Sequence, residues 1–112
     1  MSQIRIRSYE DLNPVAQFPG VTRRTLVSGD RLTFVEIQLE PNAEVPEHTH
    51  PHEQAGHVAD GLVRFRIGAV ESDLGPGSSY LIPGDVPHHV VALEESTLVE
   101  VFSPVREDFA DD

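Results

Sequence analysis

The sequence has 112 residues, enough for one domain with its own core but not for two. Hydrophobic residues make up 38%, and 8 Gly and 9 Pro argue against a helical bundle. The lack of cysteine excludes disulfides, thiolate zinc sites and cysteine nucleophiles, and no apolar run approaches the roughly 20 residues of a membrane span. A net charge of −11 repels phosphate backbones and anionic lipids, so we expect no nucleic-acid or membrane partner. The first residues lack the apolar stretch of a signal peptide, so a cytoplasmic location is expected.

Short apolar segments alternate with turn signals along the chain, the pattern of an all-β barrel or sandwich. Alternation predicts a strand at 4–9, with a weak helical turn at 9–13. A hairpin is expected from strands 21–27 and 32–39, and a loop at 41–46, which holds two prolines. Strands 54–59 and 62–67 are expected to pair as a second hairpin, and strands 88–93 and 97–102 as a last one. Two further short strands are expected between these hairpins, at 70–74 and 80–82. The barrel core would span about 20–103, and the acidic residues 107–112 would form a solvated end.

Four of the six histidines lie close together in the sequence, and two follow much later. His48 and His50 are two residues apart, so in an extended segment they project from one face. Gln54 offers an amide oxygen, and His88 brings another imidazole from a distant turn. Three imidazoles and an oxygen donor suit a divalent transition metal with positions left open for water or substrate. The alternative is a set of unrelated surface histidines in loops.

The remaining polar residues of this region are not expected to be ligands. By alternation His57 and His89 point to the opposite face from Gln54 and His88, and Glu53 faces outward for the same reason. His52 has no assigned role.

The spacing of these residues is specific. The order Asn42, His48, Thr49, His50, Gln54 and Gly61 matches the first cupin motif, and the run from Gly77 through Pro83-Gly84-Asp85-Val86-Pro87 to His88 matches the second. The chain therefore resembles a minimal cupin. This resemblance implies a single domain over 1–112, folded as a double-stranded β-helix (jelly-roll) barrel. It also implies one divalent transition metal per chain (Ni, Zn, Fe, Mn or Cu), with ligands His48, His50, Gln54 and His88.

The chain departs from the usual cupin pattern at three positions. Asn42 and Asp85 stand where the family usually has Gly, and we expect both to adopt the left-handed backbone that Asn and Asp tolerate best. Gln54 stands where the family usually has Glu. A neutral amide leaves a bound metal more positive, which favours Lewis-acid polarisation of a substrate oxygen over redox cycling.

The last predicted strand carries a carboxylate among apolar residues. Glu100 and Phe102 share one face by alternation, and a carboxylate between apolar neighbours is costly unless it is paired or used. We expect Glu100 to lie inside the cavity with a raised pKa suited to general acid–base catalysis. Arg106 would then bind a substrate carboxylate at the barrel mouth. The alternative is a solvent-facing Glu100 with Arg106 as its surface partner.

The segments 48–54 and 101–109 together resemble the small cupins of the KdgF type, the pectin-degradation proteins. Those proteins linearise 4,5-unsaturated uronates released from pectate and alginate. The resemblance implies an isomerase- or lyase-type enzyme acting on a small carboxylate-bearing sugar. It matches the acid, aromatic and arginine of that group to Glu100, Phe102 and Arg106, although the acid is more often Asp there.

Two other functions stay open at this stage. One is a different cupin lyase, isomerase or cyclase, such as those of polyketide ring closure, although the chain has few aromatic residues (2 Tyr, 5 Phe and no Trp) to line a larger cavity. The other is a non-catalytic, metal-containing module that binds small molecules.

A homodimer is also expected. Ile4 and Ile6 of the first predicted strand need an apolar surface, and exposed sheet edges are usually covered or paired. Small cupins commonly dimerise through such strands, so we place 4–9 at a dimer interface.

Overall fold

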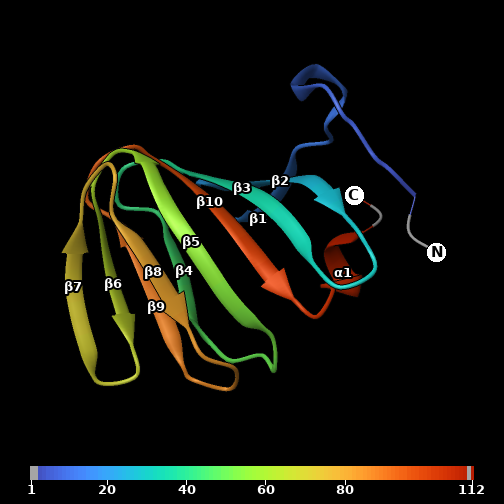
Figure 1. The fold of residues 1–112 in the computed structure, drawn as a ribbon. Helices are drawn as coiled ribbons and strands as arrows, with labels where there is room; N and C mark the ends of the chain where they lie inside the picture. Colours follow the sequence, from blue (N-terminus) through green and yellow to red (C-terminus); the bar gives the residue numbers. More distant parts are fainter. Residues whose placement is uncertain (1–2, 111) are drawn as a thin grey trace.

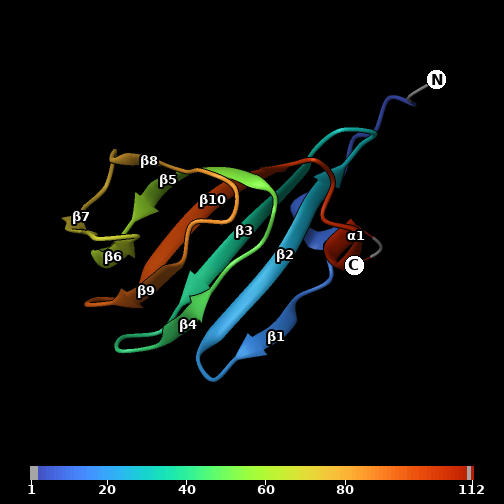
Figure 2. The same ribbon diagram turned by 90° about the horizontal axis from the view of Figure 1, so that it is seen from below.

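The computed structural model describes residues 3–110 and 112, which form two antiparallel sheets packed face to face (Figures 1 and 2). The six-stranded sheet has the order β1-β2-β3-β10-β5-β8, and the four-stranded sheet has the order β4-β9-β6-β7. The strands are β1 (Val15–Phe18), β2 (Val21–Ser28), β3 (Thr33–Leu39), β4 (Glu44–His48), β5 (Glu53–Asp60), β6 (Val63–Ile67), β7 (Val70–Leu74), β8 (Ser79–Ile82), β9 (His88–Ala92) and β10 (Ser96–Ser103). A 3₁₀ turn, η1 (Tyr9–Asp11), precedes them, and a short helix, α1 (Glu107–Ala110), follows. No helix in the described ranges is long and apolar enough to cross a membrane.

The all-β jelly-roll prediction is confirmed. Burial alternates along β3 and β10, so that each strand turns one row of side chains inward. The inner rows of the two sheets meet in one apolar core, which includes Val35, Ile37 and Leu39 of β3 and Leu98 of β10. This alternation explains why polar residues at inward positions, such as Glu100, become buried.

The strand pairing confirms one predicted hairpin and contradicts two. β2 and β3 are antiparallel neighbours, as expected. β5 pairs with β10 and β8, whereas β6 pairs with β9 and β7, so 54–59 and 62–67 form no hairpin. β9 and β10 likewise belong to different sheets. The chain therefore passes from one sheet to the other between β5 and β6, and again between β9 and β10.

The turns that flank the two sequence motifs have the expected backbone. Asn42 has φ 69° and Asp85 has φ 66°, both in the left-handed region. Asn and Asp therefore replace Gly at turns that need this conformation, because they adopt it at low cost.

Two segments before β5 differ from expectation. Residues 4–8 form no strand, and the side chains of Ile4 and Ile6 are 92% and 90% exposed. The first strand is instead β1, which pairs with β2. Part of the expected loop 41–46 belongs to β4, which is an edge strand. Pro46 has no N–H to donate, and it is tolerated there because the register of the β4–β9 pair shifts between Val45 and His48.

The acidic end of the chain is docked on the barrel at Phe109 and Asp112, so the expectation of a solvated tail at 107–112 is wrong at these two residues, whereas Glu107 and Asp108 are exposed as expected and residue 111 lies outside the described residues. Phe109 is buried, and its backbone oxygen accepts a hydrogen bond from Thr25 Oγ1 at 2.9 Å. The guanidinium of Arg23, itself buried in β2, lies 3.9 Å from the Phe109 ring centre and reaches Asp112 at 2.5 Å. A single aromatic residue among the acids anchors this tail.

Phe109→Ala should destabilise the chain by about 3 kcal/mol, because it removes a buried aromatic ring and the surface on which Arg23 rests. Urea unfolding measures the change. Val70→Ala, at a residue that is 68% exposed, should change the free energy of unfolding by no more than about 0.5 kcal/mol. Equal stability of the two variants would show that the docked tail adds nothing to the fold.

Candidate metal and substrate site

Three imidazoles meet where the two sequence motifs come together. His48 ends β4 and lies opposite His88, which begins β9. His50 follows β4 in the connection to β5, and its ring centre lies 5.6 Å from that of His48 and 4.9 Å from that of His88. One ring nitrogen from each histidine lies within 4.8 Å of the others, a geometry that could hold a metal ion.

The outer nitrogens of these rings are held by backbone carbonyls. Nδ1 of His48 and of His88 lie 2.8 and 2.9 Å from the carbonyl oxygen two residues earlier, and Nδ1 of His50 lies 3.1 Å from that of His52. Because a carbonyl only accepts, each Nδ1 carries the hydrogen, which leaves Nε2 of each ring as the atom that can offer a lone pair to a cation. Nε2 of His88 is buried and has no hydrogen-bond partner among the residues described. Converging lone pairs without a donor suit a cation, so these residues fit a divalent metal.

Gln54 joins the imidazoles to the buried carboxylate. Its Oε1 lies 3.0 Å from Nε2 of His50, and its Nε2 donates to Oε2 of Glu100 at 2.7 Å. Both side chains are buried, Gln54 on β5 and Glu100 on β10. The amide oxygen therefore lies beside Nε2 of His50, on the side where the imidazole nitrogens converge.

Burial sets the protonation of the site. It lowers the pKa of His88 to about 4 and also lowers the pKa of His50, where Arg106 adds a smaller effect in the same direction. These imidazoles are therefore neutral at pH 7, the form that binds metals. Burial also raises the pKa of Glu100, although the hydrogen bonds from Tyr80 and Gln54 oppose this shift.

Arg106 lies at the other end of the site, between two aromatic rings. Its guanidinium lies 4.8 Å from the ring centre of Phe102 and 4.0 Å from that of Phe109. Nε and Nη2 donate to the two carboxylate oxygens of Asp108 at 3.0 and 2.8 Å, which holds the pKa of Asp108 below its usual range. The surface partner of Arg106 is thus Asp108, not Glu100.

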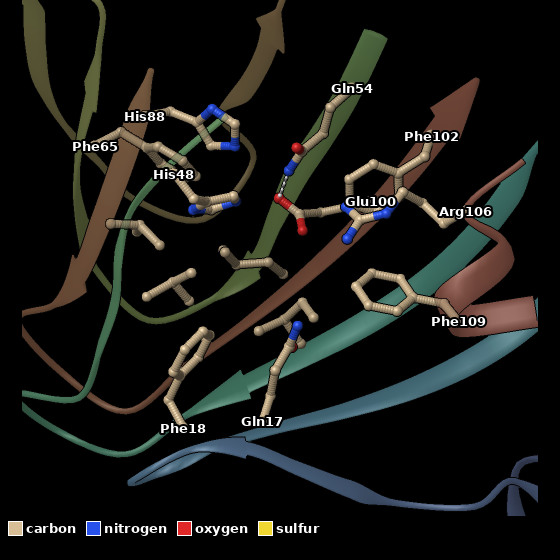
Figure 3. A pocket seen from close by; sticks show the side chains of 14 residues that line it. Gln17, Phe18, His48, Gln54, Phe65, His88, Glu100, Phe102, Arg106 and Phe109 are labelled. Atoms are coloured by element: carbon tan, nitrogen blue, oxygen red, sulfur yellow. Dashed lines mark hydrogen bonds between the residues drawn. The ribbon is translucent and has the colours of Figure 1, made fainter. Parts of the chain in front are cut away.

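These groups line a cavity of about 220 Å³. Figure 3 shows His48 and His88 on one side, Arg106 and Phe109 on the other, and Glu100 between them. The remaining wall is mostly apolar and includes Gln17 and Phe18 of β1, the strand that the sequence did not predict. The cavity therefore offers imidazoles, one carboxylate and one guanidinium in a largely apolar setting.

The other histidines and Glu53 lie outside the cluster of three. His57 is exposed and bonds Ser79 at 2.9 Å, and His89 pairs with Glu44, so both face outward as alternation predicts. Glu53 is also exposed. His52 lies beside the site instead, with Nε2 3.1 Å from the carbonyl oxygen of Val105.

Sequence reasoning missed three residues that shape the site. Tyr80 donates to Oε2 of Glu100 at 2.6 Å, and alternation in β8 was the one signal that could have placed it inside. Phe109 and Asp108, which contact Arg106, lie in a segment whose acidic composition suggested a solvated end.

Known proteins resemble this chain over most of its length. A pectin degradation protein, KdgF, of Dickeya dadantii (strain 3937) is 34% identical over 92 residues, which are 80% of this chain and 84% of that protein. The solved structure of KdgF from a Halomonas species superposes with a TM-score of 0.89 at 26% identity and covers 95% of this chain and 98% of its own. An RmlC-like cupin from Shewanella frigidimarina NCIMB 400 gives a TM-score of 0.88 at 29% identity, with 96% and 97% covered.

The family described as "Cupin domain" matches residues 35–103, from β3 to the end of β10. That range contains both histidine motifs and Glu100, and it excludes β1 and the docked tail. The chain therefore belongs to the cupin domain family.

Proposed function

We propose that this chain is a metal-dependent enzyme that linearises 4,5-unsaturated uronates from pectin or alginate breakdown. The observation that carries the proposal is one cavity with His48 and His88 at one side, the Arg106 guanidinium at the other and the Glu100 carboxylate between them (Figure 3). His50 completes the cluster of three imidazoles beside this wall. A metal-held oxygen and an arginine-held carboxylate at opposite ends suit a small carboxylate-bearing sugar. The similarity to two proteins named KdgF supports this choice.

His48, His50, His88 and the amide oxygen of Gln54 would hold one divalent transition metal. A metal bound there supplies Lewis-acid polarisation of a substrate hydroxyl or carbonyl oxygen. The neutral imidazoles and the buried amide add no negative charge to the ligand set, so the bound ion keeps its full positive charge.

Glu100 would move the proton. Its Oε2 accepts two hydrogen bonds, whereas Oε1 accepts none from the described residues and is turned to the cavity (Figure 3). Oε1 would take the hydrogen of the hemiacetal hydroxyl as the ring C–O bond breaks. It would return that proton to C4 as the resulting enol becomes a ketone, so the reaction is an isomerisation without net loss of atoms.

Arg106 would bind the substrate carboxylate. Asp108 occupies Nε and Nη2, and Nη1 makes no hydrogen bond within the described part of the chain. Stacking on Phe102 and Phe109 fixes the plane of the guanidinium. Phe102 would also line the face of the sugar.

The size of the cavity bears on the alternatives. Its volume of about 220 Å³ is below the roughly 300–1,000 Å³ of pockets for drug-sized ligands, which favours a monosaccharide over a polycyclic polyketide. A non-catalytic binding module would keep the same metal and cavity but leave the rate of substrate conversion unchanged.

His50→Ala should abolish stoichiometric metal binding, because it removes an imidazole and the neighbour of the Gln54 amide. Elemental analysis of tag-free protein after reloading with Zn²⁺ measures the content. His57→Ala, at an exposed histidine outside the cluster, is the matched control and should keep about one equivalent. A wild type that binds less than half an equivalent would contradict the metal site.

The purified, metal-loaded chain should accelerate the linearisation of 4,5-unsaturated galacturonate, followed by NMR, above the spontaneous rate. Glu100→Gln should lower the turnover by about 100-fold or more, because the amide keeps the shape of the side chain but cannot carry the proton.

Metal content is the control for both measurements and should be the same in the two proteins. An unchanged spontaneous rate with metal bound to the wild type would rule out this reaction. A Gln variant with full turnover would exclude Glu100 as the proton carrier.

We also propose that the chain is a homodimer that buries Ile4 and Ile6. These side chains are almost fully exposed in the single chain, while Arg7 holds the segment to the backbone oxygen of Thr25 at 3.1 Å. Light scattering at micromolar concentration should show a dimer at low and high salt, because apolar contacts are not screened. Ile4→Ser with Ile6→Ser should weaken dimerisation by at least about tenfold. A wild-type monomer at both salt concentrations would contradict the proposal.

A further inference from the structure

Three residues form a row across the six-stranded sheet. Glu100 of β10 lies opposite Gly56 of β5, and Gly56 lies opposite Tyr80 of β8. Residues directly opposite on neighbouring strands share a face of the sheet, and here that face is the interior. Glu100 and Tyr80 are thus two strands apart, with a glycine between them.

The glycine lets the two side chains meet. A Cβ at position 56 would overlap the Tyr80 ring at Cζ and at the phenol oxygen, so the ring occupies the space that a side chain of Gly56 would need. The φ of Gly56 is not in the left-handed region, so the requirement for glycine here is the space above β5 and not the backbone. Tyr80 crosses β5 through this gap, and its hydroxyl donates to Oε2 of Glu100 at 2.6 Å.

The same carboxylate oxygen fixes the direction of the Gln54 amide. Oε2 of Glu100 accepts from Tyr80 and from Nε2 of Gln54, at 2.6 and 2.7 Å. A carboxylate only accepts, so the NH₂ group of Gln54 must face Glu100 and its carbonyl oxygen must face the imidazoles. With the amide reversed, the NH₂ group would face the metal position, where it cannot act as a ligand.

We infer that Tyr80 is a positioning residue, which acts through Glu100 to hold the carbonyl oxygen of Gln54 toward the three imidazoles. Gly56 leaves the space that the Tyr80 side chain needs to reach Glu100. This inference rests on the proposed metal site and assigns a role to a residue outside the cavity wall. It also gives Glu100 a second role, as the acceptor that sets the orientation of a metal ligand.

The residues around Tyr80 restrict its side chain and keep its hydroxyl protonated. Its ring packs against Phe65 with a centroid distance of 4.4 Å, which restricts rotation of the side chain. Burial and the adjacent Glu100 raise the pKa of the Tyr80 phenol well above its ordinary value, so the hydroxyl keeps its hydrogen and remains a donor. Partners in the layer around a metal ligand commonly change metal affinity by about 10- to 100-fold when removed.

Tyr80→Phe removes only the hydroxyl and should weaken Zn²⁺ binding by about 3- to 10-fold, because Tyr80 is one hydrogen bond further from the ligand. Competition with a chelating indicator measures the affinity of metal-stripped protein. Tyr9→Phe is the matched control, since Tyr9 donates to Glu36 at 2.7 Å on the surface, and it should change the affinity by less than twofold. Equal affinities of the wild type and Tyr80→Phe would overturn the inference.

A double-mutant cycle tests whether Tyr80 acts through Glu100. Glu100→Met removes the acceptor with an apolar side chain of similar length, so it should weaken Zn²⁺ binding at least as much as Tyr80→Phe. Adding Tyr80→Phe to Glu100→Met should cause no further loss of Zn²⁺ affinity, because the carboxylate that links Tyr80 to Gln54 is already absent. A full second loss in the double variant would show that Tyr80 acts by another route. Thermal unfolding confirms that each variant is folded, and the Tyr80→Phe comparison decides the inference even if Glu100→Met does not fold.

The readout separates this inference from the proposed reaction. A wild type that binds Zn²⁺ but does not linearise the uronate contradicts the reaction and leaves the positioning role to be decided by the affinities. A wild type that binds no Zn²⁺ overturns the metal site and the positioning role together.

Discussion

Three imidazole nitrogens that converge on one point, with no hydrogen donor between them in the described part of the chain, constrain the centre of this barrel. Each ring is locked by a backbone carbonyl at Nδ1, so none can turn its Nε2 away without losing that hydrogen bond. The pairing of β4 with β9 brings His48 opposite His88, and the short connection to β5 then places His50 and Gln54 beside them. A cation at the centre would relieve the repulsion between these lone pairs, so metal binding would stabilise this arrangement.

The sequence predicted the inner rows of the barrel well, because side-chain direction in a strand depends only on a period of two. This rule placed Glu100 and Phe102 inside and His57 outside, as the structure has them. The backbone conformation of two turns could also be predicted from the local sequence. Asn42 and Asp85 have the left-handed backbone expected from their substitution for glycine.

Long-range features could not be predicted in this way. The alternating apolar and polar residues of β5 and β6 are compatible with a hairpin and also with strands in opposite sheets. The choice depends on contacts with the rest of the barrel, which place the two strands in different sheets. Ile4 and Ile6 alternate like a strand but find no apolar surface among the described residues, whereas 15–18 pairs with β2. Tyr80 and Glu100 are two strands apart in space and 20 residues apart in sequence, so their contact depends on a register that no local pattern reports.

The docked tail separates the contacts of Arg106 from the barrel that carries the histidines. Asp108 and Phe109, which contact the Arg106 guanidinium, follow the last strand and lie outside the range matched by the cupin family, which ends at residue 103. The barrel supplies the imidazoles, and a separate segment contacts the guanidinium that we propose binds the substrate carboxylate. If Arg106 binds the substrate as proposed, replacing this segment would change the surroundings of the guanidinium and leave the three histidines in place.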